Sequence, residues 1–579
     1  MKYIWKYLKH YPKQLVAIII ATVFTSLAIT GMPTMLARMI DEAIIPGEIN
    51  KMWPFVGIMV LIVLLGFAGR AIRMYMVADV VNNMVKDMRN DSYDKMMHLS
   101  HHEFQELGVP SLTNRITTDA FMLLQFTEMT LKQGLMAPIM LVVSFFMIFT
   151  MAPELGWRIS PAIPVLILFV TFIALSSKPL SERQQKLLDS INRILRESIT
   201  GLRVVRAFNR ESFWNKRFNS ANEPYRDTSI KLQRLLSLTM PMFALILDVV
   251  IVALIWFGAE MIDVGTLQVG DLVAFIEYVF QALFSMMIFA GVFMMYPRAS
   301  VSAGRLQEIE DQIISVENPE NPVQNVPREG TLEFRNVDFM YPDATEPVLE
   351  NISFVTKPGE TTAFIGSTGS GKSTIVKLVP RFYDVTSGEI LVNGVNIKDY
   401  DLDDLRSRIG FTPQKALLFK GKISDNLRYG KFDADEGEME TATNVAQAGE
   451  FIGRLPERFE SLLSEGGTNL SGGQKQRLSI ARSIIDDREI YIFDDSFSAL
   501  DYKTDAKVRA ALKEQTQDAS TIIVAQRVGT IMNADQIIVL DHGKVSAIGT
   551  HEELLKNSDI YYEIASSQLS EEELKIEDN

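Results

Sequence analysis

Six apolar segments near the start of the chain constrain its fold more than any other feature. They lie near Gln14–Ile40, Pro54–Val80, Leu131–Pro153, Ile159–Lys178, Pro241–Ile262 and Asp271–Pro297. A helix of about 20 apolar residues crosses the roughly 30 Å hydrocarbon layer of a bilayer. No comparable run follows Pro297. We therefore expect an all-α domain of six membrane-spanning helices, followed by a domain of another kind.

The composition supports this division. Hydrophobic residues make up 47% of the 579 residues, yet the chain carries 71 acidic and 57 basic residues, so apolar and charged residues are segregated. After Pro297, short β-branched runs alternate with amphipathic stretches, as in a soluble α/β domain. We expect a membrane domain at 1–316, a Pro- and Asn-rich linker at 317–330, an α/β domain at 331–569 and an acidic tail at 570–579.

Charge and cysteine content exclude several classes of function. The formal net charge of −14 argues against nucleic-acid binding, which needs a basic surface. The absence of cysteine excludes disulfides and thiolate metal sites, and it fits a soluble part that stays in the cytosol.

The topology follows from the flanking segments. The opening MKYIWKYLKHYPKQ, with Lys2, Lys6, Lys9 and Lys13 among aromatic residues, is typical of an interfacial elbow helix on the cytoplasmic face rather than a signal peptide. Six spans return the chain to the cytoplasm. The long charged segments Asn82–Lys132 and Ser181–Thr239 are expected to continue the spans as cytosolic helices, with ordinary loops as the alternative.

A phosphate-binding loop opens the nucleotide site. The sequence GSTGSGKST follows the strand-like TTAFI and precedes the helix-like TIVKLVPRFY, which is the setting that such a loop requires. Glycines leave backbone N–H groups free to surround a phosphate, Lys372 reaches the β- and γ-phosphates, and Ser373 ligates Mg²⁺. The predicted ATP-binding loop is Gly366, Ser367, Thr368, Gly369, Ser370, Gly371, Lys372, Ser373 and Thr374.

Two further segments belong with this loop. The strand-like EIYIFDD ends in acids, and its Asp494 is the candidate magnesium ligand opposite the loop. The segment LSGGQ opens a helix-like stretch, so its N–H groups also suit a phosphate. A single nucleotide cannot easily use both helix ends of one chain. The residues of this second segment are Leu470, Ser471, Gly472, Gly473 and Gln474.

With these motifs the chain resembles an ABC exporter half-transporter of the bacterial multidrug type, from the elbow helix to the last helix of the ATPase domain. The resemblance implies a six-helix transmembrane domain with long cytosolic helix extensions, followed by an α/β P-loop nucleotide-binding domain. It implies that Tyr341 stacks on adenine, that Gln414 senses Mg²⁺ and water, and that ATP and Mg²⁺ are required. It also implies a D-loop at Ser498, Ala499, Leu500 and Asp501.

The resemblance further implies a dimer. The LSGGQ signature of each chain would close on nucleotide held by the phosphate loop of the other. Coupling helices would fall near Pro110–Asp119 and Ile199–Phe208, and the fourth and fifth spans would cross into the partner's half.

Two positions depart from the family pattern. Asp495 stands where the family has a catalytic glutamate, and its side chain is shorter by one methylene, about 1.5 Å. Gln526 stands where the family has its switch histidine. Each change alone could be drift or an engineered substitution. Together they resemble the degenerate half of a heterodimeric exporter, which binds ATP at an impaired site and donates its signature to a partner with Glu and His at these positions.

The membrane segments suggest a polar and a flexible apolar part of a substrate pathway. Asp248, Glu277 and Gln281 lie within predicted spans, where they would face a cavity or serve helix packing; a pairing with Arg70 or Arg73 is the other possibility. Met286 and Met287 are flexible side chains suited to varied apolar ligands, although such residues also serve as core or lipid-facing positions.

These features predict ATP-driven export of hydrophobic or amphiphilic compounds from the cytoplasm or inner leaflet, by a multi-pass protein of a bacterial cell membrane. The expected partners are a second half-transporter, membrane lipid and a hydrophobic small-molecule cargo, with no nucleic acid. Lipid, haem or siderophore-type cargo, including uptake of iron chelates, remains an alternative. An ATP-gated channel or sensor on the same architecture is another.

Overall fold

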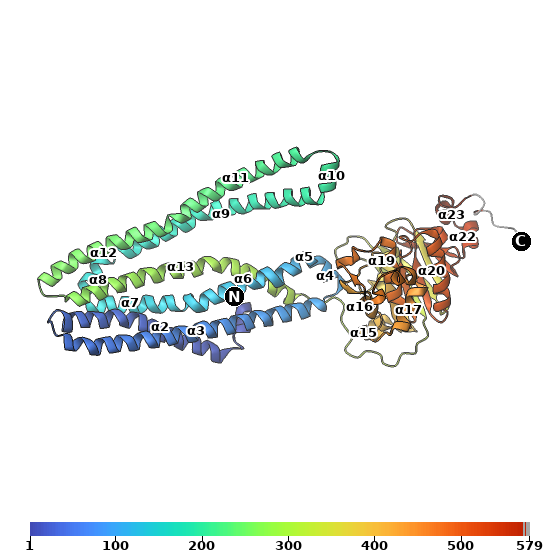
Figure 1. Cartoon of the computed structure of the whole chain (residues 1–579). Coiled ribbons are helices and arrows are strands. Elements are labelled where there is room, and N and C mark those ends of the chain that lie inside the picture. The colour runs from blue at the N-terminus through green and yellow to red at the C-terminus, as the bar shows by residue number, and fades with distance from the viewer. Residues whose placement is uncertain (571–573, 575–579) are drawn as a thin grey trace. The chain divides into compact units, whose positions relative to one another are not determined.

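A computed structural model describes residues 1–570 and residue 574 (Figure 1). The chain divides into two compact units. The first comprises Met1–Met97 and Pro110–Asp311; the second comprises His98–Val109 and the chain from Gln312 onward. The segment His98–Val109 therefore groups with the α/β part, although we expected it within a membrane domain at 1–316. Apart from Ser570 and Leu574, the predicted acidic tail lies outside the described residues.

The described residues of the first unit form helices and connecting turns, without strands. The helices are α1 (Lys2–Leu8), α2 (Pro12–Met39), α3 (Ile49–Met97), α5 (Val109–Asn114), α6 (Ala120–Met129), α7 (Met136–Met151), α8 (Pro153–Ile159), α9 (Ala162–Thr200), α10 (Leu202–Ala207), α11 (Glu211–Ser237), α12 (Thr239–Asp263) and α13 (Val269–Asp311). Single π-helical segments occur at Ile40–Ile44, Arg115–Asp119 and Thr130–Gly134.

Six helical stretches in the described chain are long and apolar enough to cross a membrane, as the apolar runs predicted. They are Pro12–Ile44, Ile49–Met97, Val109–Met151, Pro153–Thr200, Glu211–Asp263 and Val269–Asp311. The last has 43 residues, about 65 Å at 1.5 Å per residue. That is about twice the hydrocarbon thickness, so these helices extend well beyond the layer that they cross.

The fourth and fifth spans form a long antiparallel pair. Figure 1 shows α9 and α11 side by side, diverging from α6 and α13 toward α10. Gln184 Nε2 donates to Ser229 Oγ at 2.8 Å across this pair. Ser181–Thr239 is therefore helical rather than a loop, and α10 falls within the predicted coupling segment Ile199–Phe208.

Helix α1 packs one face against the unit and exposes the other. Tyr3, Ile4, Tyr7 and Leu8 are buried, whereas Lys2, Lys6 and Lys9 are exposed. Lys6 Nζ lies 2.6 Å from the carboxylate of Glu310 at the end of α13. The N-terminal segment is thus an amphipathic helix, as the lysine and aromatic pattern predicted.

Close contact between α2 and α13 fixes their antiparallel register. Tyr278 Oη donates to the Thr30 carbonyl at 2.9 Å, and the Gly270 N–H donates to Asp41 Oδ1 at 2.7 Å. A Cβ at Gly270 would lie 2.2 Å from the Ala37 carbonyl oxygen, so only glycine allows this approach. The register brings Glu277 and Gln281 to the side of α13 that faces α2 and α3.

The described residues of the second unit form three sheets. The largest has the order β12-β11-β3-β10-β9-β6, from β3 (Thr361–Gly366), β6 (Ile409–Thr412), β9 (Ile490–Asp494), β10 (Ser520–Val524), β11 (Gln536–Asp541) and β12 (Lys544–Gly549). An antiparallel sheet has the order β2-β1-β4-β5, from β1 (Leu332–Phe339), β2 (Leu349–Thr356), β4 (Ser387–Val392) and β5 (Val395–Asn396). The short strands β7 (Gly421–Lys422) and β8 (Leu462–Leu463) pair with each other.

Helices accompany these sheets, as the alternating sequence pattern predicted. They are α4 (His101–Leu107), α14 (Lys372–Leu378), α15 (Leu402–Ser407), α16 (Ile423–Arg428), α17 (Glu436–Val445), α18 (Gly449–Gly453), α19 (Gly472–Ile484), α20 (Tyr502–Gln515), α21 (Val528–Ile531), α22 (His551–Asn557) and α23 (Asp559–Ser566). Short 3-10 turns occupy Ile397–Asp399, Arg458–Glu460 and Glu465–Gly467.

Parallel pairing in the large sheet positions the nucleotide residues. Strands β6, β9, β10, β3 and β11 run parallel, and Val524 of β10 lies opposite both Phe364 of β3 and Asp494 of β9. Because the carboxyl ends of parallel strands meet at one edge, ligands bind there in open α/β sheets. The phosphate loop, Asp494 and the positions after β6 and β10 therefore converge.

Helix α4 packs within the second unit. The His101 ring stacks on Phe382 with centroids 5.8 Å apart, and Tyr383 Oη donates to Gln105 Oε1 at 3.4 Å. The predicted coupling segment Pro110–Asp119 belongs to the first unit, and its coupling role stays a prediction. Helix α4, which packs in the α/β part, lies just before these residues in the chain. Aromatic contacts fix its position, and a hydropathy pattern does not reveal them.

Docking of α4 should weaken in mild acid. Burial, aided by the Lys377 charge, lowers the pKa of His101 below its usual 6.5. The docked state therefore disfavours the imidazolium, so docking is fully stable above about pH 6.5 and is lost progressively as the pH falls below it. Hydrogen exchange of residues 98–109, corrected for intrinsic rates, should rise severalfold between pH 7.5 and 5.5.

The variant His101→Phe keeps the ring stacked on Phe382 and removes the titrating group, so its exchange should lose this pH dependence. An unchanged pH response in the variant would assign the effect to another group.

Candidate functional site

The phosphate loop follows β3 and leads into α14. Gly369 and Gly371 have φ values of +87° and +96°, a region that other residues rarely adopt. A Cβ at Gly371 would also lie 2.5 Å from Leu349 Cδ2. The glycines identified from the sequence are therefore needed by the backbone, and the loop has the strand, turn and helix that phosphate binding requires.

Lys372 is folded back across this loop. Its Nζ donates to the carbonyl oxygens of Gly366 at 2.9 Å and Ser367 at 2.7 Å, and to Ser370 Oγ at 3.4 Å. Burial lowers the pKa of Lys372, while the charges of Asp494 and Asp495 act in the opposite direction. The ammonium group is held among weak neutral acceptors, and phosphate oxygens would be stronger acceptors for it.

Ser373 and Asp494 form a pair of oxygen donors that fits magnesium. Ser373 Oγ donates to Asp494 Oδ1 at 2.8 Å. Burial raises the pKa of Asp494, so the carboxylate would gain from a nearby cation. Magnesium prefers such oxygen ligands together with phosphate oxygens, and it would supply positive charge to a transferring phosphoryl group.

Asp495 is the point where the two unusual positions meet. Its carboxylate Oδ2 accepts from Gln526 Nε2 at 2.8 Å and from Gln414 Nε2 at 3.2 Å. The residue has a positive φ of 48°, which aspartate tolerates better than most residues, and its side chain is 7% exposed. The structure thus brings together Asp495, Gln526 and Gln414, which lie far apart in the sequence, around a single oxygen atom.

The LSGGQ segment is presented at the surface. Ser471 begins α19 as its N-cap: its Oγ accepts from the Gln474 N–H at 3.3 Å, and Gln474 Oε1 accepts from the Ser471 N–H at 2.9 Å. Ser471 and Gly472 are exposed. Among the described residues no hydrogen bond or ion pair joins Leu470–Gln474 to the phosphate loop. The signature is therefore structured but not engaged by its own chain.

The remaining predicted nucleotide residues border this site. Tyr341 is half-buried and its Oη lies 3.1 Å from Thr374 Oγ1, so its ring is next to the start of α14. Ser498 Oγ donates to the Asp495 carbonyl at 2.9 Å. Asp501 caps α20 by accepting from the Thr504 N–H at 3.0 Å. Leu500 is buried and Ala499 is exposed between them.

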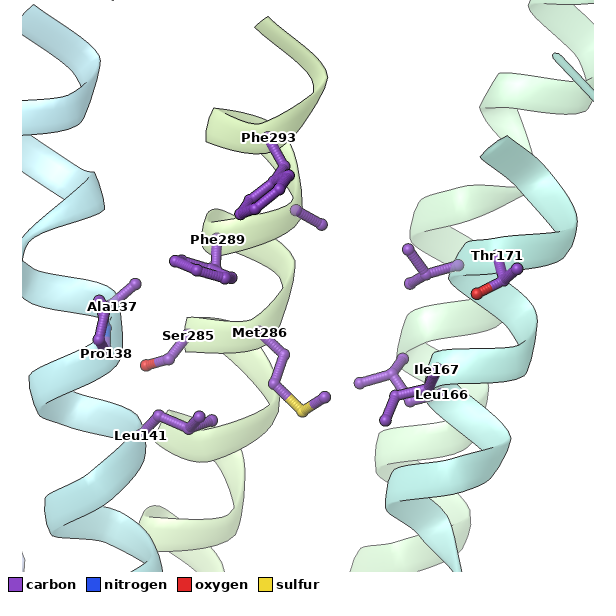
Figure 2. A pocket seen from close by; sticks show the side chains of 12 residues that line it. Ala137, Pro138, Leu141, Leu166, Ile167, Thr171, Ser285, Met286, Phe289 and Phe293 are labelled. Atoms are coloured by element: carbon purple, nitrogen blue, oxygen red, sulfur yellow. The ribbon is translucent and has the colours of Figure 1, made fainter. Parts of the chain in front are cut away.

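A cavity of about 420 Å³ lies in the first unit between α7, α9 and α13 (Figure 2). Figure 2 shows Met286 of α13 pointing toward Leu166 and Ile167 of α9, whereas the Phe289 ring lies on the side of α13 that faces Ala137 and Pro138 of α7. Its lining is almost wholly apolar, with Ser285 and Thr171 as the hydroxyl-bearing side chains. Met286 lines this cavity, and its role in a substrate pathway stays a prediction. Both Met286 and Met287 pack against the neighbouring hydrophobic core.

A second cavity, of about 590 Å³, lies between α2, α3 and α13 and contains Glu277 and Gln281. Arg70 lines the same cavity. A basic residue within an apolar run is the sequence signal for this position, and on that signal Arg70 is a possible pairing partner. Asp248 is exposed on α12 and lines neither cavity. A role for Asp248 in transport stays a prediction.

Comparisons with known proteins agree along most of the chain. Residues 15–287 match the ABC transporter transmembrane region family, and residues 349–498 match the ABC transporter family. An uncharacterized ABC transporter ATP-binding protein of Mycobacterium tuberculosis (strain CDC 1551 / Oshkosh) is 36% identical over 574 residues, 97% of each chain. The ATP-dependent lipid A-core flippase of Haemophilus influenzae (strain 86-028NP) is 32% identical, covering 98% of this chain and 97% of the flippase.

A solved structure of a bacterial Atm1-family ABC exporter with ATP bound is also similar. It superimposes with a TM-score of 0.81 at 25% sequence identity, covering 97% of this chain and 99% of the exporter chain. The likeness therefore includes both compact units.

Replacing Lys372 by alanine should weaken ATP binding about ten- to a hundredfold. The reason is the loss of charge-assisted hydrogen bonds to phosphate, each worth about 1.5–3 kcal/mol. Fluorescent ATP binding to the purified chain measures the effect, with the exposed Lys357→Ala as a matched control. Equal ATP affinities of the two variants would show that Lys372 does not contribute to phosphate binding.

Proposed function

The chain belongs to the ABC exporter family as a half-transporter, and from this premise we propose that it is the hydrolysis-impaired subunit of a heterodimer that exports amphiphilic compounds. It is a multi-pass membrane protein with a cytoplasmic ATPase domain, and it is an ATP-driven transport enzyme. These statements confirm the predicted fold, location and enzyme class. The impaired site, the heterodimer and the cargo are the proposal.

The observation that carries the proposal is the environment of Asp495. Its Oδ2 already accepts two amide hydrogen bonds, from Gln526 and Gln414. An aspartate reaches about 1.5 Å less far than a glutamate, and a misplacement of about 1 Å can cost 100-fold in rate. Gln526, unlike a histidine, neither gains nor loses a proton near neutral pH. The site is thus suited to bind nucleotide and poorly suited to activate water.

The signature segment supports the other half of the proposal. Ser471 and Gln474 cap α19 reciprocally, and the capped end remains exposed. A helix N-terminus of this kind binds a phosphate through its N–H groups and dipole. Because it makes no bond to its own phosphate loop, it is available to nucleotide held by a second chain.

The far end of the α9 and α11 pair supports a dimer. Ile199, Val204 and Phe208, in and beside α10, are 69%, 61% and 71% exposed. Clustered exposed apolar side chains commonly mark an interaction site. A partner half-transporter would bury them, in line with the implied crossing of the fourth and fifth spans.

Two observations support amphiphilic cargo. The cavity at Met286 and Phe289 is apolar and of a volume usual for small-molecule sites. The similarity to an ATP-dependent lipid A-core flippase covers almost the whole chain, so a lipid is the second candidate for the cargo. Both candidates are amphiphiles, and both would enter from the inner leaflet or cytoplasm.

The purified chain alone should bind ATP with Mg²⁺ but hydrolyse it slowly. The double variant Asp495→Glu with Gln526→His should raise its rate by at least about tenfold, because it restores reach and a titratable partner. Asp495→Glu alone should raise it less. Phosphate release by the reconstituted chain measures all three, and rapid hydrolysis by the unmodified chain would exclude the impaired site.

Within a heterodimer, Ser471→Ala should reduce ATP turnover far more than Asp495→Asn. Ser471 would face the competent nucleotide of the partner, whereas Asp495 belongs to the impaired site. The partner should be sought, by co-purification and ATPase assay, among half-transporters that carry Glu and His at the positions corresponding to Asp495 and Gln526. Similar losses from both substitutions would argue against an asymmetric pair.

A further inference from the structure

The cavity between α2, α3 and α13 combines a long apolar wall with groups of opposite charge. The wall is formed by residues such as Ala28, Ile29, Met32, Pro33, Ile62 and Phe67. The charged and amide groups are Arg70 on α3, and Glu277 and Gln281 on α13; the hydroxyl of Thr25 on α2 also lines the cavity but already donates to the Ala21 carbonyl. Its volume of about 590 Å³ lies in the range of ordinary ligand pockets.

The two charged groups in the cavity are not paired. In the described part of the chain, neither Arg70 nor Glu277 makes a hydrogen bond or an ion pair, although both line one cavity. A charged side chain within a spanning helix costs roughly 2.5–3.5 kcal/mol on insertion scales, and such residues usually pair or serve function. Arg158 and Glu260, also in the first unit, do pair, at 3.3 Å.

Gln281 adds an unsatisfied acceptor. Its side chain is 7% exposed, and its Nε2 makes only a long bond of 3.4 Å to the Ile29 carbonyl. The Oε1 atom is buried and has no hydrogen-bond partner. An unpaired buried acceptor costs about 1–3 kcal/mol. Because the terminal torsion of glutamine is broad, the amide can turn to accept from a group in the cavity.

We propose that this cavity binds the headgroup of a zwitterionic amphiphile, with its hydrocarbon chain along the apolar wall. An anionic group, phosphate or carboxylate, pairs with the Arg70 guanidinium, which suits bidentate oxygen ligands. An amine pairs with Glu277 and donates to Gln281. A purely cationic ligand is repelled by Arg70, and a purely anionic one by Glu277, so only a ligand with both charges satisfies all three groups.

This inference names the cargo class of the exporter proposed above and rests on that function. The headgroup chemistry is shared by a phospholipid such as phosphatidylethanolamine and by a free zwitterion. The apolar wall of the cavity favours the lipid-like source, because a free zwitterion would leave that wall in contact with water.

The test measures binding to the full-length chain in detergent micelles by fluorescence anisotropy. The probes are labelled lysophosphatidylethanolamine, lysophosphatidylglycerol and an alkylamine of equal chain length, with free phosphoethanolamine as a competitor. We expect the zwitterionic lipid to bind at least about tenfold more tightly than either singly charged probe. Free phosphoethanolamine should compete only weakly.

Three variants identify the groups. Arg70→Gln should weaken binding of the zwitterionic probe about tenfold and shift the binding preference toward the alkylamine. Glu277→Gln should shift the binding preference toward the anionic lipid. Gln281→Leu should weaken binding severalfold, because it removes the acceptor for the amine. Arg38→Gln and Glu42→Gln, exposed charges outside the cavity lining, serve as matched controls and should bind as the unmodified chain does.

Several outcomes would overturn the inference. These are equal affinity for the three lipid probes, equal losses in the control variants, or competition by free phosphoethanolamine as strong as by the lipid. A large drop in thermal stability for Arg70→Gln or Glu277→Gln would also do so, since it would assign these charges to helix packing. ATP binding and hydrolysis measured on the same samples report separately on the proposed ATPase role.

Discussion

The parallel register of β6, β9, β10 and β3 is the constraint on which the nucleotide half-site depends. Phe364, Val524 and Asp494 lie side by side in neighbouring strands, so the residues just after them emerge at one edge. The phosphate loop, the acidic pair and Gln526 thus meet although up to 160 positions separate them, from 366 to 526. Buried strands fix this register, because a slip by one residue would turn every side chain to the opposite face.

At that edge, the proposed impairment of the site rests on one oxygen atom of Asp495, its Oδ2. Two neutral amides donate to it, and neither amide can take up a proton from an attacking water. The same chain carries an intact, capped signature at Ser471. These two features are the basis of the proposal that the chain is one member of an unequal pair.

In the first unit, α13 lines two cavities, one with α2 and α3 and one with α7 and α9. Residues Glu277 and Gln281 line the cavity with Arg70, and Met286 and Phe289 line the apolar one. The polar groups toward one end of this helix and the flexible apolar groups toward the other are the basis of the proposed amphiphilic cargo. Because Ser285 Oγ donates to the Gln281 carbonyl at 2.7 Å, the turn between the two regions is bonded internally and adds no free polar group.

The sequence by itself determined the six spans, the α/β domain, the phosphate loop and the signature, because apolar length and glycine-rich loops leave local patterns. It also identified Asp495 and Gln526 as departures from the family. It did not place the docked helix at His101–Leu107, since aromatic contacts with Phe382 and Tyr383 fix that site. Only the tertiary structure decided that Gln526 and Gln414 both donate to one oxygen of Asp495. It also decided that Arg70 and Glu277 line the same cavity and that Asp248 does not line it. These facts depend on which helix faces and strand ends meet, and no local pattern in a chain encodes contacts between residues that are distant in the sequence.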